Sequence, residues 1–146
     1  MPLDEAARML QRVRSFFASK SPVQFRHRDF GVLTRDSRVW GGQIHRDGRD
    51  IRFFVDGSLV APNERLLDRV REVADRFATV ESDALLLLQA QVPCADRKQF
   101  EFKSLDLLWE DRPHLYAFEF ARAGDEHGIW RVEFENEKAK FVSRDD

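Results

Sequence analysis

Four histidines, at positions 27, 45, 114 and 127, are the residues best suited to acid–base or metal chemistry. No two of them are four residues apart, so the helical histidine pair that binds zinc is missing from the sequence. His45 and Asp50 flank the turn dipeptide Asp47-Gly48 and lie opposite each other if that turn closes a hairpin. Such a pair can orient an imidazole for base catalysis, but it is more often an ordinary surface contact. We therefore predict no catalytic residue and no metal ligand.

Nucleophiles and phosphate-binding loops are equally hard to find. The chain has no G-x-S-x-G elbow, and its single cysteine, Cys94, has no neighbour in sequence that stabilises a thiolate. Gly41-Gly42 is followed by a strand-like segment and lacks the Lys-Ser/Thr pair of a phosphate loop, so we interpret it as a β-bulge or a partner groove. We expect no cofactor. An enzyme on an unrecognised scaffold is the third interpretation, after two binding functions.

Charge divides the chain into a basic and an acidic part. Residues 1–60 hold 11 Lys/Arg against 7 Asp/Glu, and residues 61–146 hold 13 against 19. Arg26, Arg28 and Arg52 lie in the basic part, the first two beside Phe25 and Phe30, and arginines with aromatic rings can bind and stack on nucleic acid. The isoelectric point near 6.1 argues against that function, which we keep as the alternative.

The elements that position these residues are first an expected helix and three expected strands. Leu3, Ala6, Leu10, Val13 and Phe17 recur at helical spacing, which predicts an amphipathic helix ending before Ser21-Pro22. Residues 30–34, 38–45 and 50–56 alternate with period two. In the predicted hairpin, Trp40 pairs with Val55, Gly42 with Phe53, and Ile44 with Ile51, all on one buried face.

Two helices and four strands complete the expected order. Pro62-Asn63 begins a helix over about 64–77, and a second helix, capped by Thr79 or Ser82, contains the four buried leucines at 85–88 and ends before Pro93. Alternation predicts strands near 105–109, 116–121, 130–135 and 138–144. The predicted fold class is α+β, a single domain over residues 1–146 in the order α-βββ-αα-ββββ, with antiparallel hairpins packed against helices.

The last predicted hairpin gives the chain an acidic outer face. A two-residue turn at Asn136-Glu137 places Glu135 opposite Lys138 and Glu133 opposite Lys140 on the outside. The same register places Val132 opposite Phe141 inside, in the core. Glu119, Glu133 and Glu135 then share the outer face, with Asp125 and Glu126 on the adjoining loop. An acidic face of this kind can steer a basic protein partner into contact. An ordinary solvated sheet face is the competing interpretation.

Composition limits the class and location of the protein. The chain has 146 residues, 42% of them hydrophobic and 34% charged, which suits one globular domain and excludes a disordered or fibrous class. Its longest apolar run, residues 84–88, is far shorter than the roughly 20 residues that span a bilayer. One cysteine excludes an internal disulfide, and no basic-then-apolar leader is seen at the start. We expect a cytoplasmic protein with no membrane partner.

A resemblance adds a more specific hypothesis. Phe30-Gly31-Val32-Leu33, Trp40-Gly41-Gly42-Gln43-Ile44, and Gly48-x-x-Ile51-x-Phe53-x-Val55, followed by helices and two aromatic strands, resemble small uncharacterised bacterial α+β domains. Domains of this kind are found among immunity proteins that neutralise toxins by binding them. The resemblance thus implies a non-enzymatic bacterial protein-binding domain, with a toxin as the specific partner, and it supplies no catalytic residue.

Overall fold

A computed structural model describes residues 23–145 of the chain, so the amphipathic helix expected before Ser21 lies outside the described residues. The described elements are β1 (Val23–His27), β2 (Gly31–Asp36), β3 (Val39–Arg46), β4 (Arg49–Asp56), α2 (Glu64–Asp75), α3 (Phe77–Gln91), β5 (Phe100–Leu107), β6 (Leu115–Arg122), β7 (Asp125–Glu135) and β8 (Lys138–Asp145). A 3₁₀ turn, η1 (Arg97–Gln99), precedes β5.

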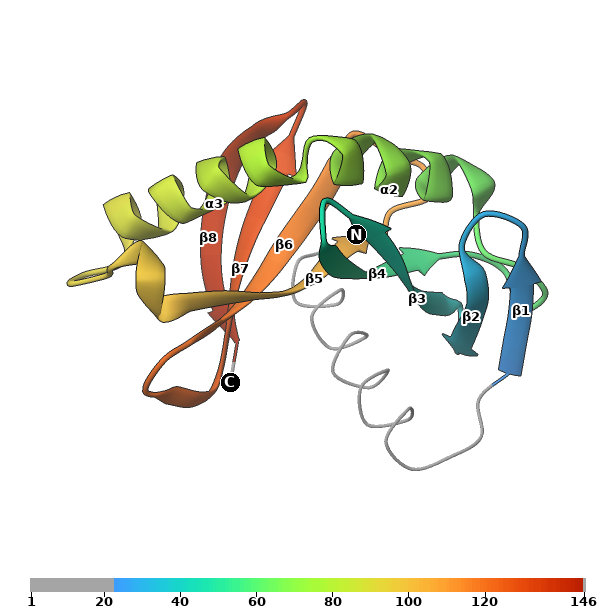
Figure 1. Cartoon of the computed structure of the whole chain (residues 1–146), viewed down its shortest axis with the longest axis horizontal. Helices are drawn as coiled ribbons and strands as arrows, with labels where there is room; N and C mark the ends of the chain where they lie inside the picture. The colour runs from blue at the N-terminus through green and yellow to red at the C-terminus, as the bar shows by residue number, and fades with distance from the viewer. Residues whose placement is uncertain (1–22, 146) are drawn as a thin grey trace.

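All described strands belong to one eight-stranded sheet whose spatial order is the chain order. Neighbouring strands are antiparallel except β4 and β5, which are parallel. A parallel pair needs a crossover connection, and α2 and α3 supply it. Figure 1 shows the two helices running end to end along one side of the sheet. We call the sheet face under these helices the first face and the opposite one the second face.

This mixed sheet corrects the predicted fold class. The prediction of three strands before the helices missed β1, and the prediction of antiparallel hairpins alone missed the parallel β4–β5 pair. β1 has five residues, three of them exposed, so it carries almost no buried alternation for a sequence pattern to detect. Alternation also reports which residues are buried but not the direction in which a strand returns after a helical segment.

The β3–β4 hairpin has the predicted register, with Trp40 opposite Val55, Gly42 opposite Phe53, and Ile44 opposite Ile51. Its pairing is continuous, so the predicted bulge at Gly41-Gly42 is wrong. The glycine has a packing reason instead. A Cβ on Gly42 would lie 2.9 Å from Cζ of the Phe53 ring, so the absence of a side chain makes room for that ring.

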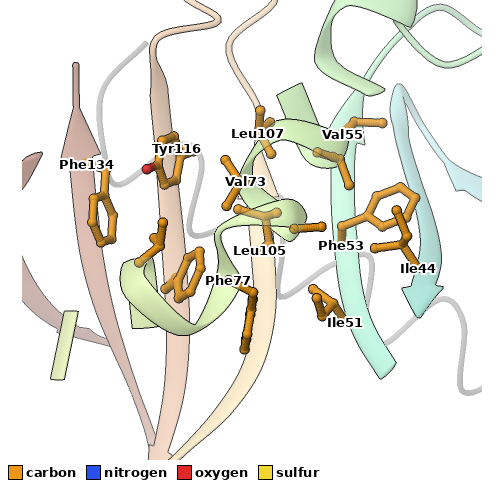
Figure 2. Close-up of a cluster of buried hydrophobic side chains, with 14 of the residues drawn as sticks. Ile44, Ile51, Phe53, Val55, Val73, Phe77, Leu105, Leu107, Tyr116 and Phe134 are labelled. Carbon is orange, nitrogen blue, oxygen red and sulfur yellow. The ribbon is translucent and has the colours of Figure 1, made fainter. Parts of the chain in front are cut away.

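The two helices cover the first face through a continuous hydrophobic core. The Asn63 side chain accepts a hydrogen bond from the Leu66 backbone N–H at 3.1 Å, which fixes the start of α2 as predicted. Figure 2 shows the core where α2 and α3 meet the strands; the labelled side chains are Ile44, Ile51, Phe53, Val55, Val73, Phe77, Leu105, Leu107, Tyr116 and Phe134.

Helix α3 departs from its prediction in two ways. It begins at Phe77, directly after Arg76 and without a side-chain cap, rather than after a Thr79 or Ser82 cap. The Phe77 ring packs on Phe118 with a centroid distance of 5.4 Å. Leu88 is fully buried, but Leu86 is 54% exposed, so the four leucines are not buried on several sides. Helix α3 packs on the sheet through one side, which carries its buried residues Phe77, Val80, Ala84 and Leu88. Neither α2 nor α3, with 12 and 15 residues, has the length and apolar character of a membrane-spanning helix.

A β-bulge changes the register of the last hairpin. Glu135 pairs with Lys138 as predicted, but an irregularity beyond that pair places Glu133 opposite Phe141 and Val132 opposite Val142. The predicted pairs Glu133–Lys140 and Val132–Phe141 are therefore wrong. A bulge inserts one extra residue into a strand and moves every later side chain to the opposite face. Phe141 consequently shares the second face with Glu133 rather than packing in the core.

Candidate partner-binding site

The second face carries its own apolar cluster, next to a group of polar side chains. Val39, Phe54, Leu108 and Trp109 are all less than 7% exposed and pack together, with Leu115 against them. Phe54, which lies opposite Gly41 on this face, is covered within the cluster. The two faces of the sheet thus differ in chemistry: the main hydrophobic core lies on the first face, and the second face combines a smaller apolar cluster with buried ionisable side chains.

Glu119 and Arg131 form a buried ion pair in this polar group. Their exposures are 0% and 3%, and Arg131 Nη2 lies 3.2 Å from Glu119 Oε2. Burial alone lowers the pKa of Arg131, but the carboxylates of Glu119, Asp106 and Asp145 outweigh that effect and raise it. Glu119 is therefore an internal residue, and the sequence expectation that placed it on an accessible acidic surface needs correction. Alternation assigned the correct face of the strand but could not show that this face is buried.

The Asp125 carboxylate is likewise hydrogen-bonded within the protein, while Glu126 is exposed. The Asp125 carboxylate accepts hydrogen bonds from Arg144 at 2.8 and 2.9 Å, from Trp130 Nε1 at 3.0 Å, and from the Gly128 N–H at 3.2 Å. The hydrogen bonds from Arg144 do most to hold the pKa of this carboxyl far below its ordinary range. Asp125 therefore organises the start of β7, where the sequence suggested a polar loop.

Glu133 and Glu135 are brought together in a pocket of about 240 Å³, which we call the β6–β8 pocket. Its lining residues are Trp109, Arg112, Leu115, Tyr116, Glu133, Phe134, Glu135, Lys140 and Phe141. Oε1 of Glu133 is buried and has no hydrogen-bond partner within residues 23–145, and burial raises the pKa of its carboxyl group. Phe141 is 59% exposed at the pocket. An accessible aromatic ring next to an apolar cavity is typical of a protein-binding surface.

The edge strand beside this pocket is protected against pairing with another strand. β8 lies at the end of the sheet order, and it carries Lys138, Lys140 and Arg144 together with the bulge. Cationic side chains and bulges on edge strands discourage the addition of further strands. A partner is therefore expected to contact side chains at the pocket rather than to extend the sheet.

A second exposed apolar feature follows β4. Leu59 and Val60 are 64% and 79% exposed, yet the loop that presents them is held firmly. The Ser58 carbonyl accepts from Trp40 Nε1 at 3.0 Å, and its N–H donates to the Ala61 carbonyl at 2.9 Å. Because β4 and β5 are parallel, this loop leaves the sheet at the same end as Trp109 does after β5. Both apolar features therefore lie toward one end of the sheet.

The arginines of the alternative function are exposed but separated. Arg26 on β1 and Arg52 on β4 are three strand spacings apart, about 14 Å, and Arg28 lies in the turn after β1, with Asp29 at 3.6 Å. The expected stacking partners are not accessible: Phe30 is 7% exposed, and Phe25 is half-buried with its ring 5.8 Å from that of Trp40. The geometry thus provides exposed positive charge without an aromatic platform.

The histidines make contacts typical of structural or surface residues. His45 lies opposite Asp50 as predicted, with Nδ1 and Oδ1 2.8 Å apart, but both side chains are about two-thirds exposed. His27 Nε2 lies 3.1 Å from Glu64 Oε1, and its Nδ1 accepts from the Asp29 N–H at 3.0 Å, so both ring nitrogens are engaged. Within the described part of the chain, no three His, Cys, Asp or Glu side chains are grouped to hold a metal ion.

Sequence reasoning missed the residues that give the pocket its shape. Trp109 was assigned to a strand, and Phe141 to the core; the bulge that turns Phe141 outward has no clear sequence signal in Lys138-Ala139-Lys140. No protein-family model matches the chain, and searches among curated proteins and among solved structures likewise find no match.

Proposed function

We propose that the chain is a non-enzymatic protein-binding domain and that its partner docks at the β6–β8 pocket. The observation that supports this most directly is Phe141, 59% exposed beside a cavity lined by further aromatic side chains. Exposing a large aromatic ring to water is unfavourable unless a partner covers it, and aromatic anchors contribute strongly to protein interfaces.

The charges around the pocket favour a specific orientation of the partner. Glu133 and Glu135 are two of the five acidic residues expected from the sequence to bind a partner, and Arg112 and Lys140 add cations to the same lining. A rim that carries both positive and negative charges selects a partner with complementary charges and fixes its orientation. The specific version of the proposal, implied by the resemblance, is an immunity protein that neutralises a toxin in the bacterial cytoplasm by direct binding.

A capture experiment with a matched control tests this proposal. Phe141→Ser removes the exposed ring, and Leu86→Ser removes a side chain of similar exposure, 54%, on α3 and outside the pocket lining. We expect the tagged full chain to retain one protein in stoichiometric amount, the Leu86→Ser variant to retain it equally, and the Phe141→Ser variant to lose it.

Equal capture by both variants would contradict the assignment of the pocket. Recovery of nucleic acid alone, released by salt and lost on combined replacement of Arg26, Arg28 and Arg52, would instead support the alternative of a nucleic-acid or nucleotide binder. Turnover of a substrate by the purified chain would contradict the non-enzymatic proposal.

A further inference from the structure

The β6–β8 pocket has the size of one side chain rather than of a small-molecule site. Its volume of about 240 Å³ is below the roughly 300–1,000 Å³ typical of pockets for small molecules and cofactors. Trp109, Leu115 and Phe141 give it apolar walls. A flat or extended side chain from a protein partner matches such a cavity better than a metabolite does.

Glu133 gives the pocket a carboxylate whose buried Oε1 accepts no hydrogen bond from residues 23–145. Its neighbours in register are Ala117 on β6 and Phe141 on β8, and neither has a side chain that can donate a hydrogen bond. Arg131, two residues away on the same face, is directed to Glu119 at 3.2 Å and Asp145 at 3.5 Å. A carboxylate oxygen left buried without a donor is costly, so an occupant that brings N–H donors and positive charge gains the most.

Among protein side chains, arginine meets both requirements of the pocket. Its guanidinium group is planar, so it stacks on aromatic rings, and its fork of N–H donors matches a carboxylate. Its aliphatic stem contacts apolar walls while the charged end reaches a polar group. An aspartate or glutamate would be repelled by Glu133, and a purely apolar side chain would leave the carboxylate unpaired.

We propose that the β6–β8 pocket receives an arginine side chain of the protein partner, with Glu133 pairing with the guanidinium group and Trp109 and Phe141 as its apolar walls. The terminal torsion of glutamate is soft, so a small rotation brings the buried Oε1 to the new donor. Arg112 and Lys140 lie at the pocket as exposed residues, and Glu135 partly balances their charge. This inference rests on the proposed function, because it names the chemistry of the partner at that site.

NMR titration of the full chain with single-residue probes tests the inference without the partner. Nα-acetyl-arginine methylamide is the probe, and the citrulline analogue is its neutral control of nearly the same shape. We expect the arginine probe to bind about tenfold more tightly than the citrulline probe, the usual size of a charge-assisted hydrogen bond. The indole N–H signal of Trp109 should shift, and those of Trp40 and Trp130, which are bonded to Ser58 and Asp125, should not.

Glu133→Gln should abolish the preference for arginine over citrulline, and Glu101→Gln, at an exposed position on β5 outside the pocket lining, should preserve it. Equal binding of the two probes, or an unchanged preference in Glu133→Gln, would overturn the inference. If the arginine preference is missing but Phe141→Ser still abolishes partner capture, the proposed function stands and the arginine assignment is wrong. Capture without any effect of Phe141→Ser would contradict the proposed function itself.

Discussion

Replacing Arg131 by methionine should destabilise the protein strongly, although the residue lies on the sheet face away from α2 and α3. Arg131 is 3% exposed, and its guanidinium group forms an ion pair with the fully buried Glu119. Methionine preserves most of the volume and the apolar contacts of the arginine stem. The substitution therefore isolates the loss of positive charge from the loss of packing.

The expected magnitude follows from the separation of the two groups. At 3.2 Å and an effective dielectric constant of about 20, their attraction is about 5 kcal/mol. The desolvation penalty of the arginine disappears with it, but the carboxylate that remains is still buried and now lacks this compensating charge. Removing one partner of a buried pair generally costs about 3–5 kcal/mol, so we expect the free energy of unfolding to fall by about 3 kcal/mol. Most domains have about 5–15 kcal/mol of stability, so the variant should remain folded.

Urea unfolding followed by tryptophan fluorescence measures this loss. Arg26→Met, the same substitution at an exposed position on β1, serves as the control and should change the stability by no more than about 0.5 kcal/mol. The double variant Glu119→Gln/Arg131→Met should be more stable than Arg131→Met alone, because it also removes the buried negative charge with which Arg131 pairs. If Arg131→Met costs less than about 1 kcal/mol, Glu119 is accessible to water in solution, and the description of this cluster as internal is wrong.

Three further substitutions test other parts of the structure. Glu133→Gln should raise the free energy of unfolding at pH 7 by about 1 kcal/mol, because it removes a carboxylate whose pKa is raised by burial. The gain should disappear as the pH falls and the Glu133 carboxylate of the wild-type protein becomes protonated, which melting curves at several pH values would show. Gly57→Ala should lower stability by about 1–3 kcal/mol in urea unfolding, because its Cβ would lie 2.6 Å from the Ala61 carbonyl oxygen, a backbone atom. Asp125→Asn should lower the melting temperature at pH 7, because the hydrogen bonds from Arg144 lower the pKa of Asp125; the difference should vanish as the wild-type carboxylate is protonated in acid.

The β3–β4 hairpin was predictable because two independent signals agree there. Asp47-Gly48 favours positive φ, and the structure has 51° and 76° at these residues. The flanking residues alternate in a way that permits one register with a buried face, and Trp40 does face Val55. Where both the turn and the alternation are strong, the pairing of strands can be derived from the sequence.

Other parts of the fold lacked one of these signals. β1 is mostly exposed, so it shows no hydrophobic alternation, and the parallel β4–β5 contact depends on the path of the chain through two helices. The turn at Asn136-Glu137 was predicted correctly, but the bulge near Lys140 then shifted the register. A single inserted residue leaves the composition of a strand unchanged while it exchanges the two faces.

The candidate site shows the same limit: the sequence pattern indicates on which face of the sheet a residue lies, but not whether that residue is buried. The sequence correctly indicated that Glu133 and Glu135 share a face of the sheet, but it treated every charged residue there as solvent-exposed. Glu119 is instead buried with Arg131, and Asp125 is bonded to Arg144. Which carboxylates are available to a partner depends on what packs over the face and across the strands, and this is decided by tertiary structure.

The topology explains why the available charge and the exposed aromatic ring gather at one end of the sheet. α2 and α3 cover the first face, and the cationic side chains and bulge of β8 discourage strand addition at that edge. β5 ends and β6 begins beside the β7–β8 turn, so Trp109, Leu115 and Phe141 converge there although they come from separate segments. The register partners of Glu133 on the neighbouring strands, Ala117 and Phe141, have no side-chain hydrogen-bond donor. A site that combines an exposed ring with an unsatisfied carboxylate stabilises the free protein poorly but gains from a complementary partner, as expected when stability is given up for binding.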